Sequence, residues 1–199
     1  VPEGAYQVVL MPTLEEYHEH GLRIQRRIDL RIANAKYAET PVETLDQRRQ
    51  AALDGAARRN LNIFSEVAKM ALGRWGQVKP AVIEAAIERI NRRADCSDFY
   101  LLGLLGMLYR FGDAAEFPAA IKPALEACIL NFKYWIDEPG EDAMCYWTEN
   151  HQILFHACEI LAGQLYPERV FSNNGETGAW HCAKGEERAR SWLRKRMEG

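Results

Sequence analysis

Residues 148–167 form the stretch TENHQILFHACEILAGQLYP. At about 100° per residue, its apolar side chains return to one face of a helix. Those side chains are Leu154, Phe155, Cys158, Leu161, Ala162 and Leu165. Pro167 ends the helix, because proline lacks the N–H that a continuing helix needs. The stretch therefore predicts a largely buried helix over residues 148–165.

The same helical spacing recurs along the chain, whereas period-2 alternation extends over no more than a few residues. Thr44 and Gln47 have the spacing of a capping box, Pro80 suits a first helical turn, and Ser97 suits an N-cap. We expect helices over residues 14–36, 44–75, 80–93, 97–112, 118–135, 148–165 and 182–197. Residues 171–180 are expected to form a loop long enough to reach over a neighbouring site.

Short turns between these helices predict antiparallel packing of neighbours. Strongly apolar helices at 97–112 and 148–165 alternate with more charged ones, which is typical of a two-layer ring or solenoid. We therefore predict a single all-α domain over residues 1–199, whose antiparallel helix pairs form part of an (α/α)-toroid. The helices are too few to close a ring, so we expect an open arc or a piece of a longer protein.

The amino-acid composition and net charge bear on which kinds of molecule the chain can bind. The chain is 48% hydrophobic and 27% charged, as globular proteins are. Its 25 basic and 28 acidic residues give a formal net charge of -3, so no overall positive field attracts nucleic acid. The most apolar stretch, residues 99–109, is about half the ~20 residues that a membrane-spanning helix needs. We expect neither a nucleic-acid nor a membrane partner.

The cysteines are five, widely spaced and without a C-x-x-C pair. We predict unpaired thiols and neither a metal nor a cofactor; the residues are Cys96, Cys128, Cys145, Cys158 and Cys182. Unpaired thiols, with no basic-then-apolar leader at Val1, slightly favour the cytoplasm. Export stays open because the initiator Met is absent, and no pattern indicates an oligomeric state.

His151 lies one turn before the apolar face of the 148–165 helix, beside Glu149 and Asn150. The free N–H groups of a first helical turn favour bound anions. His151 is either a base at the mouth of a cleft shared with aromatic side chains or a hydrogen-bonded core histidine. His156 and Glu159 are spaced as a metal-binding pair or a surface pair; the surface pair is favoured, because no second helix carries the same two residues.

The segments WTENHQ at 147–152 and LAGQLYP at 161–167 resemble the Asn-His helix of heparinase II/III-type and alginate-lyase-type polysaccharide lyases. That resemblance implies an (α/α)-toroid in which Asn150 neutralises a uronate carboxylate and His151 removes the neighbouring proton. The chain departs from the lyase pattern at Glu149, where the lyases have Asn or Ser. The downstream Tyr of the lyases has no assigned counterpart.

Further candidates for contact with a carbohydrate substrate are Tyr146, Trp147, Glu149, Arg110, Trp180 and His181. The aromatic residues among them, together with Trp135, flank this helix and the loop after it. The aromatic rings either stack on sugar or pack in the core. Arg110 either clamps a carboxylate or satisfies a helix C-terminus. The basic run over residues 188–196 follows the sign order that a helix dipole favours, and it also suits an anionic partner.

The first functional hypothesis is a carbohydrate-active enzyme, a polysaccharide lyase that cleaves uronate-containing glycans by β-elimination. One alternative is a glycoside hydrolase of toroid fold that uses Glu149 with Asp137 or Glu138 as paired carboxylates. Another is a non-catalytic helical scaffold whose concave face binds a partner. An ultraviolet-absorbing unsaturated product would separate the lyase from the hydrolase, and the absence of any turnover would favour the scaffold.

Overall fold

The structure, a computed structural model, describes residues 2–13, 18, 19, 21, 26–32 and 44–198. Its contacts divide the chain into two compact units, Val1–Glu43 and Thr44–Gly199, where the sequence predicts one domain. Most described elements are helices, which confirms the mainly-α class, while the toroid stays a prediction. None of the described helices combines the length and the apolar character needed to cross a membrane.

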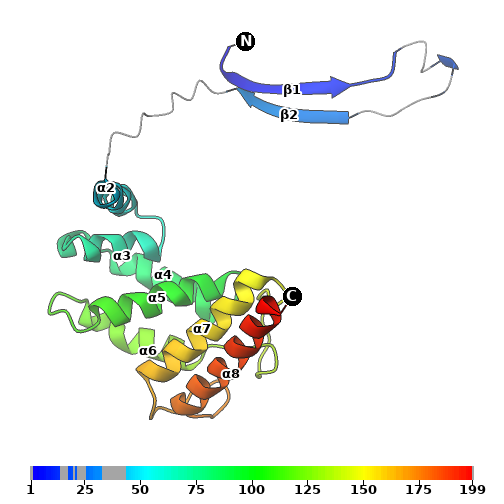
Figure 1. Ribbon diagram of the computed structural model, residues 1–199. Helices are drawn as coiled ribbons and strands as arrows, with labels where there is room; N and C mark the ends of the chain where they lie inside the picture. Colours follow the sequence, from blue (N-terminus) through cyan, green and yellow to red (C-terminus); the bar gives the residue numbers. More distant parts are fainter. Residues whose placement is uncertain (1, 14–17, 20, 22–25, 33–43, 199) are drawn as a thin grey trace. The chain divides into compact units, whose positions relative to one another are not determined.

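The first unit contains an antiparallel pair of strands, β1 (Gly4–Leu10) and β2 (Arg26–Ile32) (Figure 1). Tyr6 pairs with Leu30 and Val8 with Ile28, so these apolar side chains share one face of the ribbon. On the other face, the Gln7 amide donates a hydrogen bond of 2.9 Å to Asp29.

The helix predicted over residues 14–36 is therefore wrong at 26–32, and its other residues lie mostly outside the described ones. Ile28, Leu30 and Ile32 alternate with Arg27, Asp29 and Arg31, which is the period of a strand. β-Branched isoleucine also favours extended backbone. The interpretation failed because isoleucines four apart, Ile24, Ile28 and Ile32, satisfy helical spacing equally well.

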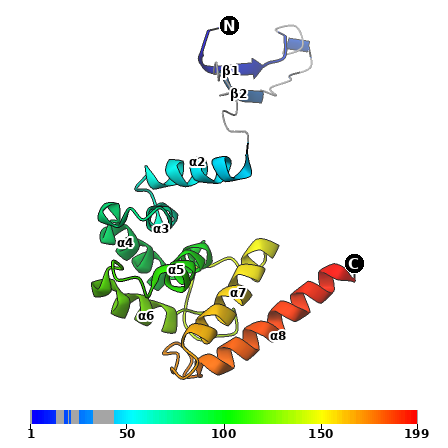
Figure 2. The ribbon, with the colours of Figure 1, turned by 60° about the vertical axis from the view of Figure 1, so that its left-hand side comes forward.

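The second unit is helical (Figures 1 and 2). Short 3-10 turns lie at Trp75–Gln77 and Ala119–Ile121. The α-helices are α2 (Leu45–Ala57), α3 (Ile63–Ala71), α4 (Pro80–Asn91), α5 (Ser97–Phe111), α6 (Lys122–Leu130), α7 (Glu149–Leu165) and α8 (Gly178–Met197).

Helix α5 is the centre of the core, since it packs against α3, α4 and α7. Its side chains at Leu101, Leu104, Leu105 and Met107 are fully buried. Helix α6 packs against α4, and α8 covers α7 on the side that faces away from α5. Helix α7 therefore lies between α5 and α8, in agreement with the largely buried helix predicted from its apolar face.

The predicted bounds of α4, α5 and α7 are confirmed to within two residues, and so is the start of α2. The Thr44–Gln47 capping box is complete: the Thr44 hydroxyl accepts from the Gln47 amide, and the Gln47 side chain accepts from the Thr44 amide. Ser97 is not the N-cap, because its Oγ donates to the Ala94 carbonyl at 2.6 Å.

Two predicted helices are too long. The helix over 44–75 is interrupted after Ala57, because Asn62 caps a new helix by accepting from the Phe64 amide at 3.1 Å. Helix α6 ends at Leu130 rather than at Trp135. Beyond it, the Tyr134 amide donates to Glu138 instead of to a helical carbonyl (3.0 Å).

Helix α8 begins at Gly178, earlier than predicted, with the Thr177 hydroxyl accepting from the Trp180 amide at 3.2 Å. The preceding loop is closed by a bridge between Val170 and Thr177, and Phe171 is fully buried. This loop is therefore packed by its own aromatic residue. All five cysteines are free thiols, which confirms the prediction that they are unpaired.

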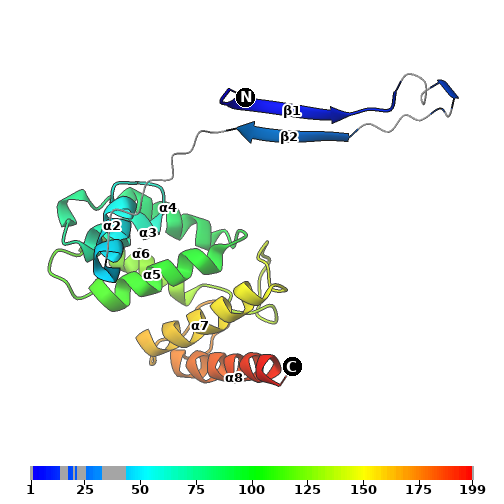
Figure 3. The same cartoon turned by 45° about the horizontal axis from the view of Figure 1, so that its top comes forward.

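Helices α7 and α8 run antiparallel and approach closely at the end where they are connected (Figure 3). A Cβ atom added to Gly163 would lie 2.5 Å from the Cys182 amide nitrogen. At Gly185, an added Cβ would lie 2.9 Å from Ile160. In Figure 2 the helices diverge from this contact toward the first turn of α7 and the last turn of α8.

Gly163→Ala should destabilise the fold by about 1–3 kcal/mol, because the new methyl group has to displace backbone of α8. Gly106→Ala is the control: it lies in α5 with open space around it, and it should stabilise by about 0.5–1 kcal/mol. Urea denaturation followed by circular dichroism measures both. Equal stabilisation by the two substitutions would show that the close approach of α7 and α8 is absent.

Candidate functional site

Helix α7 presents different side chains to its two neighbours. His151 faces α5, where its Nδ1 lies 2.8 Å from Asp98 Oδ2. Gln152, His156 and Glu159 face α8 or line the space beside it. The polar side chains of α7 therefore contribute to two separate sites, one beside α5 and one beside α8.

A cleft of about 320 Å³ lies where α7 and α8 diverge. We call it the α7–α8 cleft; it is lined by Trp135, Gln152, His156, Glu187, Arg188, Ser191, Trp192, Lys195 and Arg196. On α8, residues 188, 191, 192 and 195 recur at helical spacing, so one face of this helix forms a wall.

The charged groups of the cleft are mostly cationic. Arg188, Lys195 and Arg196 line it, with Glu187 as the one carboxylate among the lining residues. The Arg196 guanidinium lies over the Trp192 ring, 4.1 Å from its centroid, and pairs with Glu149 at 3.1 Å. This combination of cations and indole rings suits an anionic ligand that also offers apolar surface.

His156 is one of the residues that line the cleft, and only 4% of its surface is exposed. Its ring lies 4.5 Å from that of Trp135, and its Nδ1 is buried without a hydrogen-bond partner. Burial, together with the charge of Arg188, lowers the pKa of His156 to about 4. His156 is therefore a neutral imidazole at neutral pH. The surface-pair interpretation of His156 and Glu159 is wrong, because both side chains are buried.

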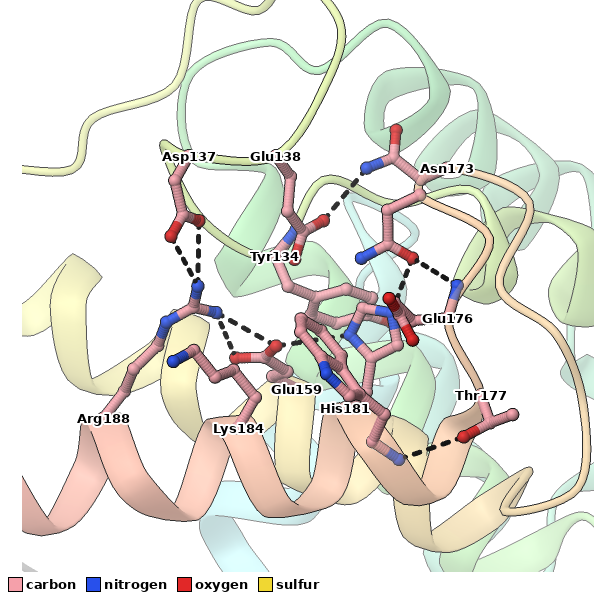
Figure 4. Close-up of polar contacts among 12 residues, drawn as sticks. Tyr134, Asp137, Glu138, Glu159, Asn173, Glu176, Thr177, His181, Lys184 and Arg188 are labelled. Carbon is pink, nitrogen blue, oxygen red and sulfur yellow. Dashed lines mark hydrogen bonds and ion pairs between the residues drawn. The ribbon is translucent and has the colours of Figure 1, made fainter.

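Behind the cleft lies a buried polar network centred on Glu159, whose side chain is fully buried (Figure 4). Arg188 donates to both Glu159 oxygens, at 3.0 and 2.8 Å, and its other terminal nitrogen donates to Asp137. Each terminal nitrogen of Arg188 thus engages one carboxylate, and the two contacts together fix the guanidinium plane. Arg188 therefore links the network to the wall of the cleft.

His181 is the second side chain of α8 that contacts Glu159. Its Nδ1 lies 3.2 Å from Glu159 Oε1, and its Nε2 lies 3.1 Å from Asn174 Oδ1. The Asn174 oxygen also accepts from the Glu176 amide, which fixes the side-chain amide orientation. Both ring nitrogens therefore lie within hydrogen-bond distance of an oxygen atom.

Glu138 is the second buried carboxylate of this region. Its Oε2 accepts from the Tyr134 amide and from Asn173 Nδ2 at 2.9 Å, while its Oε1 has no partner. Burial raises the pKa of Glu138, and the nearby Glu159 carboxylate raises it further. The ligand atoms of Glu138, Glu159 and His181 lie within 4.8 Å of one another, but His181 and Arg188 already contact the Glu159 carboxylate. A metal ion would have to displace them.

The structure does not bring the predicted site residues together. Glu149 and Asn150 are exposed on the first turn of α7, and Trp147 is 77% exposed beside them. Arg110 lies at the end of α5 opposite to Asp98, over the Phe111 ring. The remaining predicted residues are Tyr146, stacked in the core on Phe155, and Trp180 and His181, at the start of α8.

His151 itself is 7% exposed, and the Phe99 ring meets it edge-on at 5.1 Å. It is not among the residues that line the α7–α8 cleft. Sequence reasoning did not select Gln152, His156 or Trp192 as site residues. The spacing of Arg188, Trp192 and Lys195 on one helical face was the signal that could have indicated this cleft.

No family model, no curated protein and no solved structure matches the chain. The likeness to polysaccharide lyases therefore rests on residues 147–167 alone.

The low pKa of His156 predicts a pH dependence of stability. In the unfolded chain its pKa is near 6.5, so between pH 6.5 and about 4 the unfolded state binds more protons than the folded state. Stability should therefore fall as the pH falls through this window, by at most about 3 kcal/mol from this residue. His156→Gln should lose less stability than the unmodified chain over the same window.

Urea denaturation at a series of pH values measures this difference. The carboxylates with raised pKa, Asp98 and Glu138, are present in both chains, so their opposite contributions cancel. Parallel stability curves for the two chains would contradict a buried neutral His156.

Proposed function

We propose that the helical unit binds an acidic carbohydrate in the α7–α8 cleft and cleaves it by β-elimination. The observation that carries the proposal is one cleft in which three cationic side chains, two indole rings and a neutral imidazole meet. A uronate-containing glycan offers a carboxylate for the cations and C–H faces for the rings.

The cations divide into two groups. Arg188 is already occupied by Glu159 and Asp137, so its charge is largely balanced. Lys195 has no ion-pair partner among the described residues. Arg196 forms its ion pair with Glu149, whose side chain is 73% exposed, and donates long hydrogen bonds of 3.4 and 3.5 Å to Trp192 and Gln152. Lys195 and Arg196 are therefore the groups free to bind a carboxylate of the ligand.

β-Elimination requires that the carboxylate be neutralised and that a base remove the proton next to it. Hydrogen bonds from Lys195 and Arg196 would make this proton more acidic. His156 would take it up, and the electron pair would form the carbon–carbon double bond as the glycosidic C–O bond breaks. The leaving oxygen would take a proton from water or from the Lys195 ammonium.

The resemblance to lyases assigns the same two roles to Asn150 and His151. His151 is held by Asp98 and faces α5, whereas Asn150 is exposed. We therefore place the base at His156 and retain the Asn150–His151 assignment as the competing proposal.

Hydrolysis by paired carboxylates has less support. The candidates Asp137, Glu138 and Glu149 are engaged with Arg188, the Tyr134 amide and Arg196, respectively. Among the cleft-lining residues only Glu187 carries a carboxylate, and two are needed.

The double substitution Lys195→Gln/Arg196→Gln should weaken binding of acidic oligosaccharides at least about 10-fold, the equivalent of roughly 1.4 kcal/mol, because charge-assisted hydrogen bonds are lost. Isothermal titration calorimetry with oligogalacturonate, oligomannuronate and heparin oligosaccharides measures it, with neutral cello-oligosaccharides as the ligand control. Arg190→Gln/Arg194→Gln removes the same charge from α8 outside the cleft and should leave binding nearly unchanged. Equal losses in both double variants would refute the cleft as the binding site.

His156→Gln should lower turnover by about 10²- to 10⁴-fold with the dissociation constant unchanged, because only the proton transfer is lost. Turnover is followed by the ultraviolet absorbance of the unsaturated product. Asn150→Ala, an exposed substitution, should change stability by less than about 0.5 kcal/mol and leave turnover normal. A loss of about 10²- to 10³-fold in Asn150→Ala alone would move the chemistry to the first turn of α7. Binding without any product would identify a scaffold.

A further inference from the structure

A second group of polar side chains lies at the N-terminus of α5, on the side of α7 that faces away from α8. A carboxylate oxygen of Asp95, the Cys96 sulfur and one ring nitrogen of His151 all lie within 4.8 Å of one another. The three residues come from the turn before α5 and from the first turn of α7. They supply one oxygen, one sulfur and one nitrogen, a donor set that Zn²⁺ accepts.

His151 is oriented by a fourth residue. Asp98 Oδ2 lies 2.8 Å from Nδ1, so in the neutral ring the tautomer that this contact favours has its proton on Nδ1 and a lone pair on Nε2. Metal-bound histidines in proteins commonly have such a carboxylate on the other nitrogen. Asp98 is fully buried, and its Oδ1 has no hydrogen-bond partner.

The turn that carries the other two side chains is fixed by hydrogen bonds. Arg89 donates to the Asp95 carbonyl at 2.7 Å, and the Cys96 amide donates to Asp95 Oδ1 at 3.0 Å. Cys96 has φ of 65°, a left-handed conformation that only a few residue types adopt readily. The backbone therefore holds Asp95 and Cys96 in a defined position beside His151.

We propose that Asp95, Cys96 and His151 bind a Zn²⁺ ion, with Asp98 positioning His151. In a tetrahedral site with metal–ligand bonds of about 2.0–2.3 Å, ligand atoms are about 3.3–3.7 Å apart. The three ligand atoms lie within 4.8 Å of one another, so metal binding would draw them closer together. Three protein ligands leave the fourth position to water, and binding displaces the thiol proton of Cys96.

The group formed by Glu138, Glu159 and His181 provides the contrast. There both imidazole nitrogens face acceptors, and Arg188 engages both Glu159 oxygens. We call the group formed by Asp95, Cys96 and His151 the α5 site. There, among the described residues, no arginine or lysine forms an ion pair with the Asp95 carboxylate, and one ring nitrogen of His151 has no hydrogen-bond partner. This difference favours the α5 site for a cation.

The test uses Co²⁺ as a spectroscopic substitute for Zn²⁺, added to the full chain. We expect one equivalent to give a thiolate-to-cobalt charge-transfer band in the near ultraviolet, which Zn²⁺ displaces. Cys96→Ser and His151→Gln should each abolish the band, whereas Cys182→Ser should keep it. Cys182 is the matched control, because it is the other half-buried cysteine.

Asp98→Asn should fold and should bind Co²⁺ about 10- to 100-fold more weakly, as expected for loss of the group that orients a metal ligand. Circular dichroism verifies the folding of each variant. No band in the unmodified chain, or a band that survives Cys96→Ser and disappears in Cys182→Ser, would overturn the proposal. These readouts measure metal binding alone, so they do not depend on the carbohydrate proposal.

Discussion

The carboxylate of Glu159 sets the strongest constraint on the helical unit, because it is fully buried and needs positive partners. On α8, Arg188 supplies a positive charge, and His181 lies within hydrogen-bond distance of the same carboxylate. Two turns of α8 are therefore held in register against α7, and the link from Arg188 to Asp137 extends this register to the segment after α6. Removing one partner of such a buried pair typically costs about 3–5 kcal/mol, so the packing of this region depends on the pair staying complete.

The contacts of the buried Glu159 carboxylate also help to form the α7–α8 cleft. The glycine contacts bring α7 and α8 together at one end, and the Glu159–Arg188 pair fixes their separation in the middle. Beyond this point the helices diverge (Figure 2). Trp192, Lys195 and Arg196 of α8 line the cleft there. The cleft thus follows from two different kinds of contact along one helix pair.

Elements governed by local chemistry could be predicted from the sequence. Pro80, the Thr44–Gln47 box and the apolar face of α7 each act within one or two turns, and they located α4, α2 and α7. The strand at 26–32 was missed because isoleucines four apart fit both periods. Its partner strand is the information that decides between them, and that information is non-local.

The candidate site was less predictable, for a similar reason. His151 has the position expected of a first-turn base, but the residue that decides its orientation, Asp98, is 53 positions away in the sequence. His156 was taken for a surface residue, because nothing in the sequence around it shows that Trp135 and α8 cover it. Helical spacing gives the direction of a side chain on its own helix, but the chemistry depends on which element lies opposite.

The left-handed backbone at Cys96 lowers the stability of the fold, whereas the thiol at that position is needed for the proposed metal site. Glycine and asparagine adopt this conformation at lower cost than cysteine does, so selection for stability alone would replace the thiol. Strained backbone conformations of this kind persist where the surrounding structure over-determines them, and they concentrate at functional sites. Screens for thermostable variants would therefore tend to select Cys96→Gly or Cys96→Asn and, with them, chains that have lost the sulfur ligand.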